Sequence, residues 1–342
     1  MNRSTIKATL QYALGFALLA WVILRNWRPA SGEPGLADTF ALPFHPLTFA
    51  IAALLTATSA LVSFTRWFSL VRAQGLPFRY IDALRLGMVG YFFNTFLPGS
   101  IGGDIVKAAG IAREQQRRTV AVATVIIDRA IGLWGLLWLL ALCGLAFYLA
   151  GNELLLDNRG LMTLVQSAWV AAILSAGVWF ALGLLPERRA GRGAGRLRSL
   201  PKVGRVLAEL WWAVWTYRKK PRAVALALAL SVVCHTINVA AYHLASRAFV
   251  DPAEESQLPT LSEHYLVIPV GLTVQAFVPT PGGLGGGEFS FGALYQLLGR
   301  AKPLGVRASL IVRVVMWALG LVGYLVYLRM KKSGVVRLPS GT

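Results

Sequence analysis

Two short glycine-rich segments interrupt long apolar stretches of this sequence, and they share the same order of residue types. The first, at residues 94–104, reads NTFLPGSIGGD, and the second, at residues 275–288, reads QAFVPTPGGLGGGE. Each begins with an amide side chain, continues through proline and glycine, and ends with a carboxylate. Proline and glycine interrupt helices, and at membrane depth an interrupted helix is tolerated only where it is buried in protein or lines a cavity. A matched pair of such breaks therefore indicates a binding site between two related halves of a membrane protein.

The composition of the chain is that of an integral membrane protein. Of its 342 residues, 56% are hydrophobic and 14% are charged, whereas a soluble domain averages about 25% charged residues. A membrane-crossing helix needs ~20 apolar residues. Six apolar stretches are close to that length or longer: residues 8–24, 47–64, 119–149, 161–185, 223–249 and 306–328. We therefore expect an all-α integral membrane protein in which residues 1–342 form a single polytopic domain with six full transmembrane helices.

Three shorter apolar stretches flank the two glycine-rich segments. They are residues 81–97, 264–279 and 287–299. Because they are short for a full crossing and also adjoin the helix breaks, we interpret them as arms of two re-entrant helical hairpins. Each hairpin is expected to turn at one of the glycine-rich segments, where glycine lets the backbone bend without a side-chain clash.

The basic residues fall mostly on one side of this predicted topology. With the N-terminus in the cytoplasm, 25 of the 34 Lys and Arg residues lie in the cytoplasmic termini and connections. These segments are residues 1–7, 65–118, 186–222 and 329–342. Such a positive-inside distribution predicts that both termini are cytoplasmic. It also directs the net charge of +19 toward anionic lipid headgroups, so the charge does not require nucleic acid as a partner.

The predicted topology makes the two halves of the chain an inverted repeat. The first hairpin follows a helix that runs inward and the second follows a helix that runs outward, so the hairpins enter from opposite faces. The repeat units are residues 47–149 and 223–328. The spacing of charges supports this pairing, because an arginine follows the carboxylate by 25 residues in both units, at Asp104 and Arg129 and at Glu288 and Arg313. Arginine is costly in a bilayer, so we assign both pairs to the repeat.

The two segments are suited to an anion site near the middle of the bilayer. A helix begins after each break, and its free N–H groups and positive dipole end attract anions. Lys107, Arg129 and Arg313 add positive charge to that site. The carboxylates of Asp104 and Glu288 have two possible roles, which are to hold the arginines in place or to bind a coupling cation or proton.

The candidate substrate-binding residues come from both segments and from the charged positions that follow them. They are Asn94, Gly99, Gly102, Gly103, Asp104, Lys107, Asp128, Arg129, Gln275, Gly282, Gly283, Gly285, Gly286, Glu288 and Arg313. Simpler roles are open for several of them. The glycines can serve close helix packing alone, Asp128 can simply neutralise Arg129, and the amides of Asn94 and Gln275 can cap the broken backbone.

No metal or cofactor site is expected. The two cysteines and four histidines are scattered along the sequence, and neither their number nor their spacing fits a metal centre or a disulfide framework. His235, Asn238 and His243 share one predicted span. We interpret these three residues as a polar contact between helices.

The segment at 186–222 is predicted to be a basic cytoplasmic loop that contains an interfacial helix. Residues 201–217 present an apolar, tryptophan-containing face between basic flanks, which is typical of a helix that lies on the membrane surface. The Gly- and Arg-rich run at 188–198 is expected to form a flexible loop.

Three runs of the sequence resemble a known family. They are FNTFLPGSIGGD at 93–104, DRAIG at 128–132 and PGGLGGGE at 281–288. They are similar to the lysylphosphatidylglycerol synthase transmembrane-domain family, also called the flippase-like family, and the resemblance extends over nearly the whole chain. It implies a multi-pass protein of a bacterial-type inner membrane that translocates lipid. The full-length synthases carry a soluble aminoacyl-transferase domain after the membrane region; this chain continues only 14 residues past its last span, so we expect a stand-alone member without synthase activity.

Three hypotheses about function follow. The first is a translocator of an anionic phospholipid or a polyprenyl-phosphate-type lipid, working by alternating access; in that case Arg129→Ala and Arg313→Ala should each abolish translocation by a folded protein. The second is a membrane-embedded transferase acting on a lipid headgroup, with Asp104 or Glu288 as base. The third is a non-transporting scaffold for a lipid-modifying enzyme partner. Because no nucleophile–base pair stands out, we expect a transporter rather than an enzyme.

Overall fold

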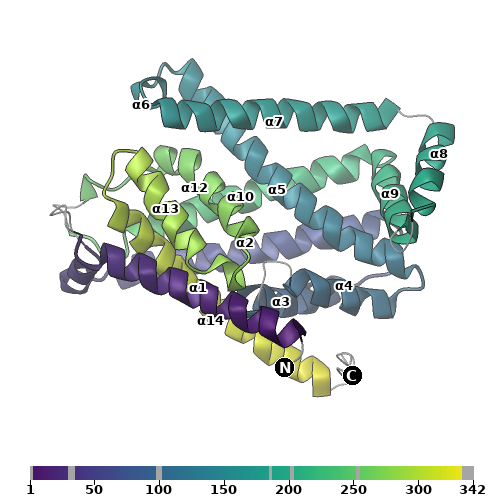
Figure 1. Ribbon diagram of the computed structural model, residues 1–342, viewed down its shortest axis with the longest axis horizontal. Helices are drawn as coiled ribbons and strands as arrows, with labels where there is room; N and C mark the ends of the chain where they lie inside the picture. Colours follow the sequence, from purple (N-terminus) through teal and green to yellow (C-terminus); the bar gives the residue numbers. More distant parts are fainter. Residues whose placement is uncertain are drawn as a thin grey trace.

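The computed structural model describes residues 3–29, 35–97, 102–184, 187–200, 204–251 and 255–332. The described chain is built from helices (Figure 1) and contains no β-strand, although one isolated antiparallel bridge joins Phe44 to Phe249.

Six of the described helices are long and apolar enough to cross a membrane. They are α1 (Arg3–Trp27), α2 (Pro46–Ala73), α5 (Arg118–Leu149), α7 (Arg159–Leu184), α10 (Pro221–Ser246) and α14 (Lys302–Lys332). By length and composition, these helices confirm the predicted all-α fold with six spans. Helix α2 extends well past the predicted end at residue 64, to Ala73. Arg66, Trp67, Leu70 and Val71 of this extension are buried in the bundle.

Two pairs of shorter helices contain the glycine-rich segments. The first pair is α3 (Tyr80–Phe96) and α4 (Gly102–Glu114). The second is α12 (Leu261–Phe277) and α13 (Gly286–Leu297), joined through the 3-10 turn η2 (Pro281–Gly283). Helices α3 and α12 both have 17 residues, and α4 and α13 have 13 and 12. At 1.5 Å per residue the longest arm measures about 26 Å, which is less than the ~30 Å hydrocarbon core.

Residues that favour helix initiation occur at the starts of three helices, α2, α10 and α12. Proline occupies the first turn of α2 and of α10, where its missing N–H costs no hydrogen bond. Helix α12 begins with a capping box, in which the backbone N–H of Glu263 donates to Thr260 Oγ1 at 3.2 Å and that of Thr260 donates to Glu263 Oε2 at 2.6 Å.

The helices pack so that the two broken pairs share neighbours. Helix α5 crosses the molecule obliquely and contacts both α4 and α12 (Figure 1). Helix α14 contacts both α3 and α13, and α2 and α10 form the most extensive contact between two helices. The main apolar core includes Leu139, Val239, Ile268, Phe291 and Val312, which come from five different helices. The first turn of α1 and the last turns of α14 lie at the same end of the molecule (Figure 1).

The remaining elements connect the long helices. The 3-10 turn η1 (Ala37–Ala41) precedes α2, and α6 (Glu153–Leu156) precedes α7. Between α7 and α10 lie α8 (Glu187–Arg198) and α9 (Gly204–Arg218). The expectation of a flexible loop at 188–198 is therefore wrong, because these residues form α8, which packs against α9.

Helix α9 occupies most of the segment that was predicted to lie on the membrane surface. It is docked on the bundle as well. Trp215 is buried, and the hydroxyl of Tyr217 donates to the carbonyl of Leu70 at 2.8 Å. Leu207 and Trp212 remain exposed, so the helix presents apolar side chains both inward and outward.

Candidate functional site

A central cavity of about 330 Å³ lies where the two glycine-containing helix pairs meet. Asn94 and Thr95, at the end of α3, form one part of its wall, and Gln275 and Gly282, from α12 and η2, form another. Residues of α2, α5, α10 and α14 complete the lining. The fold thus brings together two motifs that are far apart in the sequence, and the volume is within the ~300–1,000 Å³ typical of ligand sites.

Gly282 makes this meeting of the two motifs possible. Its φ is +56°, in the left-handed region that favours glycine. A Cβ added at Gly282 would lie 3.2 Å from the carbonyl oxygen of Thr95 and 3.2 Å from Nη1 of Arg313. Both the backbone conformation and the space therefore select glycine at this position.

The two arginine–carboxylate pairs that share the 25-residue spacing are ion pairs in the structure. Arg129 Nη1 lies 2.7 Å from Asp104 Oδ2, and Arg313 Nε lies 2.6 Å from Glu288 Oε1. Of the two roles considered for the carboxylates, the geometry supports holding the arginines in place. In the sequence, the sign of this pairing was the equal 25-residue spacing between each carboxylate and its arginine.

The two ion pairs differ in their access to the cavity. The side chains of Arg313 and Glu288 are 2% and 0% exposed, whereas those of Arg129 and Asp104 are 29% and 16% exposed. Arg313 also donates from Nη1 to the carbonyl of Gly282 at 2.7 Å. Arg129 lines the cavity, and Arg313 is not among the lining residues. Arg313 therefore supports the wall, while Arg129 can meet a ligand.

Arg129 also joins the two broken helix pairs. Its Nη1 binds Asp104 on α4, and its Nη2 donates to the carbonyl of Ala276 on α12 at 3.3 Å. A side chain on α5 thus bridges one helix from each broken pair, at the edge of the cavity.

Asp128 does not form an ion pair with Arg129, so the interpretation of these two neighbours as a charge pair is wrong. Successive residues of a helix point in different directions, and Asp128 faces Arg66 and Lys107 instead. Its Oδ1 lies 2.8 Å from Arg66 Nε, and its Oδ2 lies 3.4 Å from Lys107 Nζ. Lys107 Nζ also lies 4.4 Å from the ring centroid of Trp67.

Arg66 is a cavity residue that the sequence analysis missed. It was assigned to the connection at 65–118, whereas the structure places it inside α2 with 5% exposure. Its Nη1 donates to Ser231 Oγ at 2.8 Å, and its side chain lines the cavity. The signal in the sequence was the apolar residues that continue on both sides of Arg66.

Five charged side chains next to the cavity leave one positive charge in excess. The three cations Arg66, Lys107 and Arg129 face the two carboxylates Asp104 and Asp128. All five are at least partly buried, so solvent screens them less than surface charges. This corner of the cavity therefore favours an anion.

The amides of the two motifs cap the broken backbone. Asn94 Oδ1 accepts from the N–H of Gly103 at 2.8 Å, and Gln275 Nε2 donates to the carbonyl of Gly282 at 3.0 Å. At the start of α13 the carboxylate of Glu288 accepts from the N–H of Gly285 at 2.7 Å. Side chains of the protein thus take up part of the hydrogen-bonding capacity that the sequence analysis reserved for an anion.

The glycines of the motifs lie where helices begin or approach each other. Gly102 and Gly103 start α4, Gly283 belongs to η2, and Gly285 and Gly286 lie at the start of α13. A Cβ at Gly103 would overlap the carbonyl oxygen of Gly90, because α3 and α4 touch there by their backbones. Gly99 lies outside the described residues.

The wall of the cavity also offers two buried acceptors. His235 Nε2 lies 2.9 Å from the carbonyl of Gly132, so this nitrogen carries the proton and Nδ1 is an acceptor. Among the described residues, His235 Nδ1 and Gln275 Oε1 have no hydrogen-bond partner. Buried acceptors of this kind normally bind a donor, so hydroxyl or ammonium groups suit this wall.

The histidine-containing helix contributes polar contacts between helices, as the sequence indicated. His235 reaches Gly132 on α5, Asn238 accepts from Ser59 on α2 at 3.0 Å, and His243 lies 3.3 Å from His264 on α12 by their Nδ1 atoms. In the described part of the chain, no three His, Cys, Asp or Glu side chains gather as a possible metal site.

Comparisons with known proteins place this architecture in a family. The comparison with curated proteins gives no match. The profile of the family described as the lysylphosphatidylglycerol synthase TM region matches residues 9–323, which include both broken helix pairs and all six spans or most of each. The chain is a multi-pass membrane protein that belongs to the lysylphosphatidylglycerol synthase TM region family.

Proposed function

We propose that this protein translocates an anionic lipid or lipid-linked substrate across the membrane through the central cavity. One observation carries the proposal: a cavity with polar side chains in its wall and an excess positive charge beside it lies where two interrupted helix pairs meet. Interrupted helices at a central site are the usual arrangement in transporters. Membership of a lipid-related membrane family agrees with a lipid substrate.

In this proposal the chain is a single polytopic domain with two re-entrant hairpins. The hairpins are α3–α4 and α12–α13, they enter from opposite faces, and they belong to inverted units at 47–149 and 223–328. The near-equal arm lengths support this arrangement. We place the protein in a bacterial-type inner membrane with both termini cytoplasmic, which agrees with the first turn of α1 and the last turns of α14 lying at the same end of the molecule (Figure 1).

Arg129 provides a physical link between binding and movement. It holds α4 through Asp104 and α12 through Ala276. A lipid phosphate that enters the cavity competes with Asp104 and the Ala276 carbonyl for the guanidinium of Arg129, because arginine binds phosphate as readily as carboxylate. Loss of one of these two Arg129 contacts frees one hairpin relative to the other. Alternate breaking of the contact with Asp104 and the contact with Ala276 would open the cavity to each membrane face in turn.

Flipping of fluorescent phosphatidylglycerol in proteoliposomes tests the proposal. We expect the wild-type protein to flip this lipid and Arg129→Gln to slow flipping about tenfold or more, which is the effect of losing a charge-assisted hydrogen bond. Arg300→Gln is the matched control, because Arg300 and Glu263 form a pair of similar exposure, 28% and 13%, away from the cavity. The control should flip at the wild-type rate.

Two results contradict the proposal. One is the absence of flipping by folded wild-type protein in liposomes that contain acidic lipid, and the other is a wild-type rate for Arg129→Gln. Formation of a modified lipid from a labelled donor would point instead to the transferase. Co-purification of an enzyme in fixed ratio, without flipping, would point to the scaffold.

A further inference from the structure

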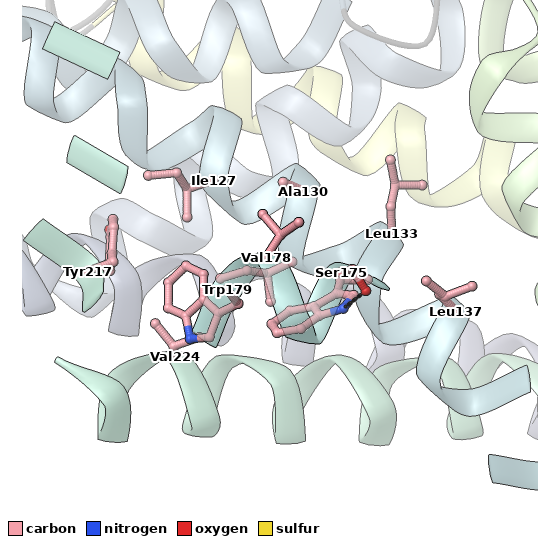
Figure 2. A pocket seen from close by; sticks show the side chains of 11 residues that line it. Ile127, Ala130, Leu133, Leu137, Ser175, Val178, Trp179, Tyr217 and Val224 are labelled. Carbon is pink, nitrogen blue, oxygen red and sulfur yellow. Dashed lines mark hydrogen bonds between the residues drawn. The ribbon is translucent and has the colours of Figure 1, made fainter. Parts of the chain in front are cut away.

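A second cavity lies away from the central one, in a groove between α5, α7, α9 and α10. Its volume is about 430 Å³, and its walls are mainly apolar, with Leu133, Val178 and Trp179 among them (Figure 2). The proposed transport mechanism makes no use of this groove.

Three of the four polar side chains in the groove, all except Trp179, already have hydrogen-bond partners in the protein. Trp134 Nε1 donates to Ser175 Oγ at 2.9 Å, Ser175 donates to the carbonyl of Ala172 at 2.9 Å, and the Tyr217 hydroxyl donates to Leu70. Because most of the wall is apolar and most of its polar groups are paired within the protein, a hydrocarbon chain fits the chemistry of the groove.

The occupant reaches the groove from the bilayer. Helices α5, α7 and α10 are three of the six candidate membrane spans. Val178, which lines the groove on α7, is 61% exposed, and its neighbours Leu174 and Phe180 are 64% and 69% exposed. Apolar side chains exposed on membrane-spanning helices face lipid chains, so a lipid chain is the available occupant.

One end of the groove adjoins a strongly basic turn. Tyr217 and Val224 line that end, and Leu137 lies at the opposite end (Figure 2). The chain between Tyr217 and Val224 carries four basic side chains and no acidic one. They are Arg218, Lys219, Lys220 and Arg222.

The basic turn lies at one end of a candidate membrane span, where lipid headgroups are expected. Pro221 is the first residue of α10, a candidate span, so the turn lies at one membrane boundary. The Arg218 guanidinium and the Lys219 ammonium lie 4.2 and 4.3 Å from the ring centroid of Trp215. Tryptophan and basic side chains gather in this way at membrane interfaces. Lys220 contacts the carbonyl of Ala73 at the end of α2.

We propose that the groove and the basic turn together bind one acidic phospholipid, with an acyl chain between α5 and α7 and the phosphate at residues 218–222. This lipid is separate from the transported substrate, and it completes the packing of α7 and α9 against α5. The apolar walls select a lipid, and the charge of the turn selects an acidic headgroup.

Native mass spectrometry of the purified full-length protein tests the proposal. The protein is equilibrated in detergent with equal amounts of phosphatidylglycerol and phosphatidylcholine that carry the same acyl chains. We expect one phosphatidylglycerol to be retained in preference. Lys219→Gln combined with Arg222→Gln should lower its retention about 30-fold, as expected for two basic residues near a lipid surface.

Two further variants separate the headgroup contact from the groove. Ala130 is exposed and lines the groove, so Ala130→Trp should fill it and prevent retention while the fold is kept. Arg329→Gln with Lys331→Gln, which removes two exposed basic residues at the end of α14, should leave retention unchanged. Equal retention of both lipids by the wild-type protein would overturn the proposal, and so would unchanged retention in Ala130→Trp. Neither outcome depends on whether the central cavity transports lipid.

Discussion

Arg129 and Asp104 form an ion pair of 2.7 Å at the edge of the central cavity, with side chains that are 29% and 16% exposed. A second ion pair, between Arg313 and Glu288, has the same spacing in the sequence and a similar length of 2.6 Å, but it is almost completely buried. Two ion pairs with the same sequence spacing thus have different physical environments, and the variants at these positions should behave differently.

Arg313→Ala should destabilise the protein. The substitution leaves the carboxylate of Glu288 buried without its counter-charge, which costs about 3–5 kcal/mol in the free energy of unfolding. The sequence alone led us to expect a folded protein that does not transport. Thermal unfolding in detergent should show a clear loss of Tm, and the double variant Arg313→Ala with Glu288→Ala should recover part of it. A wild-type Tm for Arg313→Ala would show that the pair is not needed for the fold.

Arg129→Lys should change transport much more than stability. A lysine can reach only one partner, whereas Arg129 uses two nitrogens to bind Asp104 and the carbonyl of Ala276. Because the pair is partly exposed, the free energy of unfolding should change by less than ~1 kcal/mol. We expect flipping as slow as in Arg129→Gln. Flipping at the wild-type rate would mean that charge alone is sufficient at this position.

Asp128→Ala should be strongly destabilising, because it leaves both Arg66 and Lys107 buried without a carboxylate. The expected loss is about 3–5 kcal/mol. Asp82→Ala is the matched control, since Asp82 also has two basic partners, Arg79 and Arg85, but at the surface. The control should lose less than ~1 kcal/mol. Equal unfolding curves for the two variants would contradict the conclusion that the buried contacts of Asp128 stabilise the fold.

Gly103→Ala should separate α3 from α4. The added methyl group overlaps the carbonyl oxygen of Gly90, and relief of such overpacking costs about 1–3 kcal/mol. Gly177→Ala in α7 is the control, because a Cβ at Gly177 meets nothing within 4 Å, and a helical alanine is favoured by about 0.5–1 kcal/mol over glycine. The free energy of unfolding should therefore fall for Gly103→Ala and rise for Gly177→Ala.

The spans and the breaks could be predicted from the sequence because they depend on local composition. Apolar length places the six long helices, and proline with glycine places the interruptions at 94–104 and 275–288. The equal spacing from each carboxylate to its arginine also predicted a pairing, since an isolated arginine in a membrane span requires a partner. The helix at 188–198 was missed because its glycines suggested a loop, whereas contact with α9 stabilises it.

The helical membrane architecture, the two helix breaks and the charges that accompany them could all be read from the sequence, because each follows from short-range preferences of the chain. The pairing of the charges depends instead on the tertiary structure. That structure turned Asp128 toward Arg66 and Lys107, enclosed Arg313 and left Arg129 at the cavity. These outcomes depend on helix rotation and on packing between residues far apart in the chain, and no local pattern specifies either.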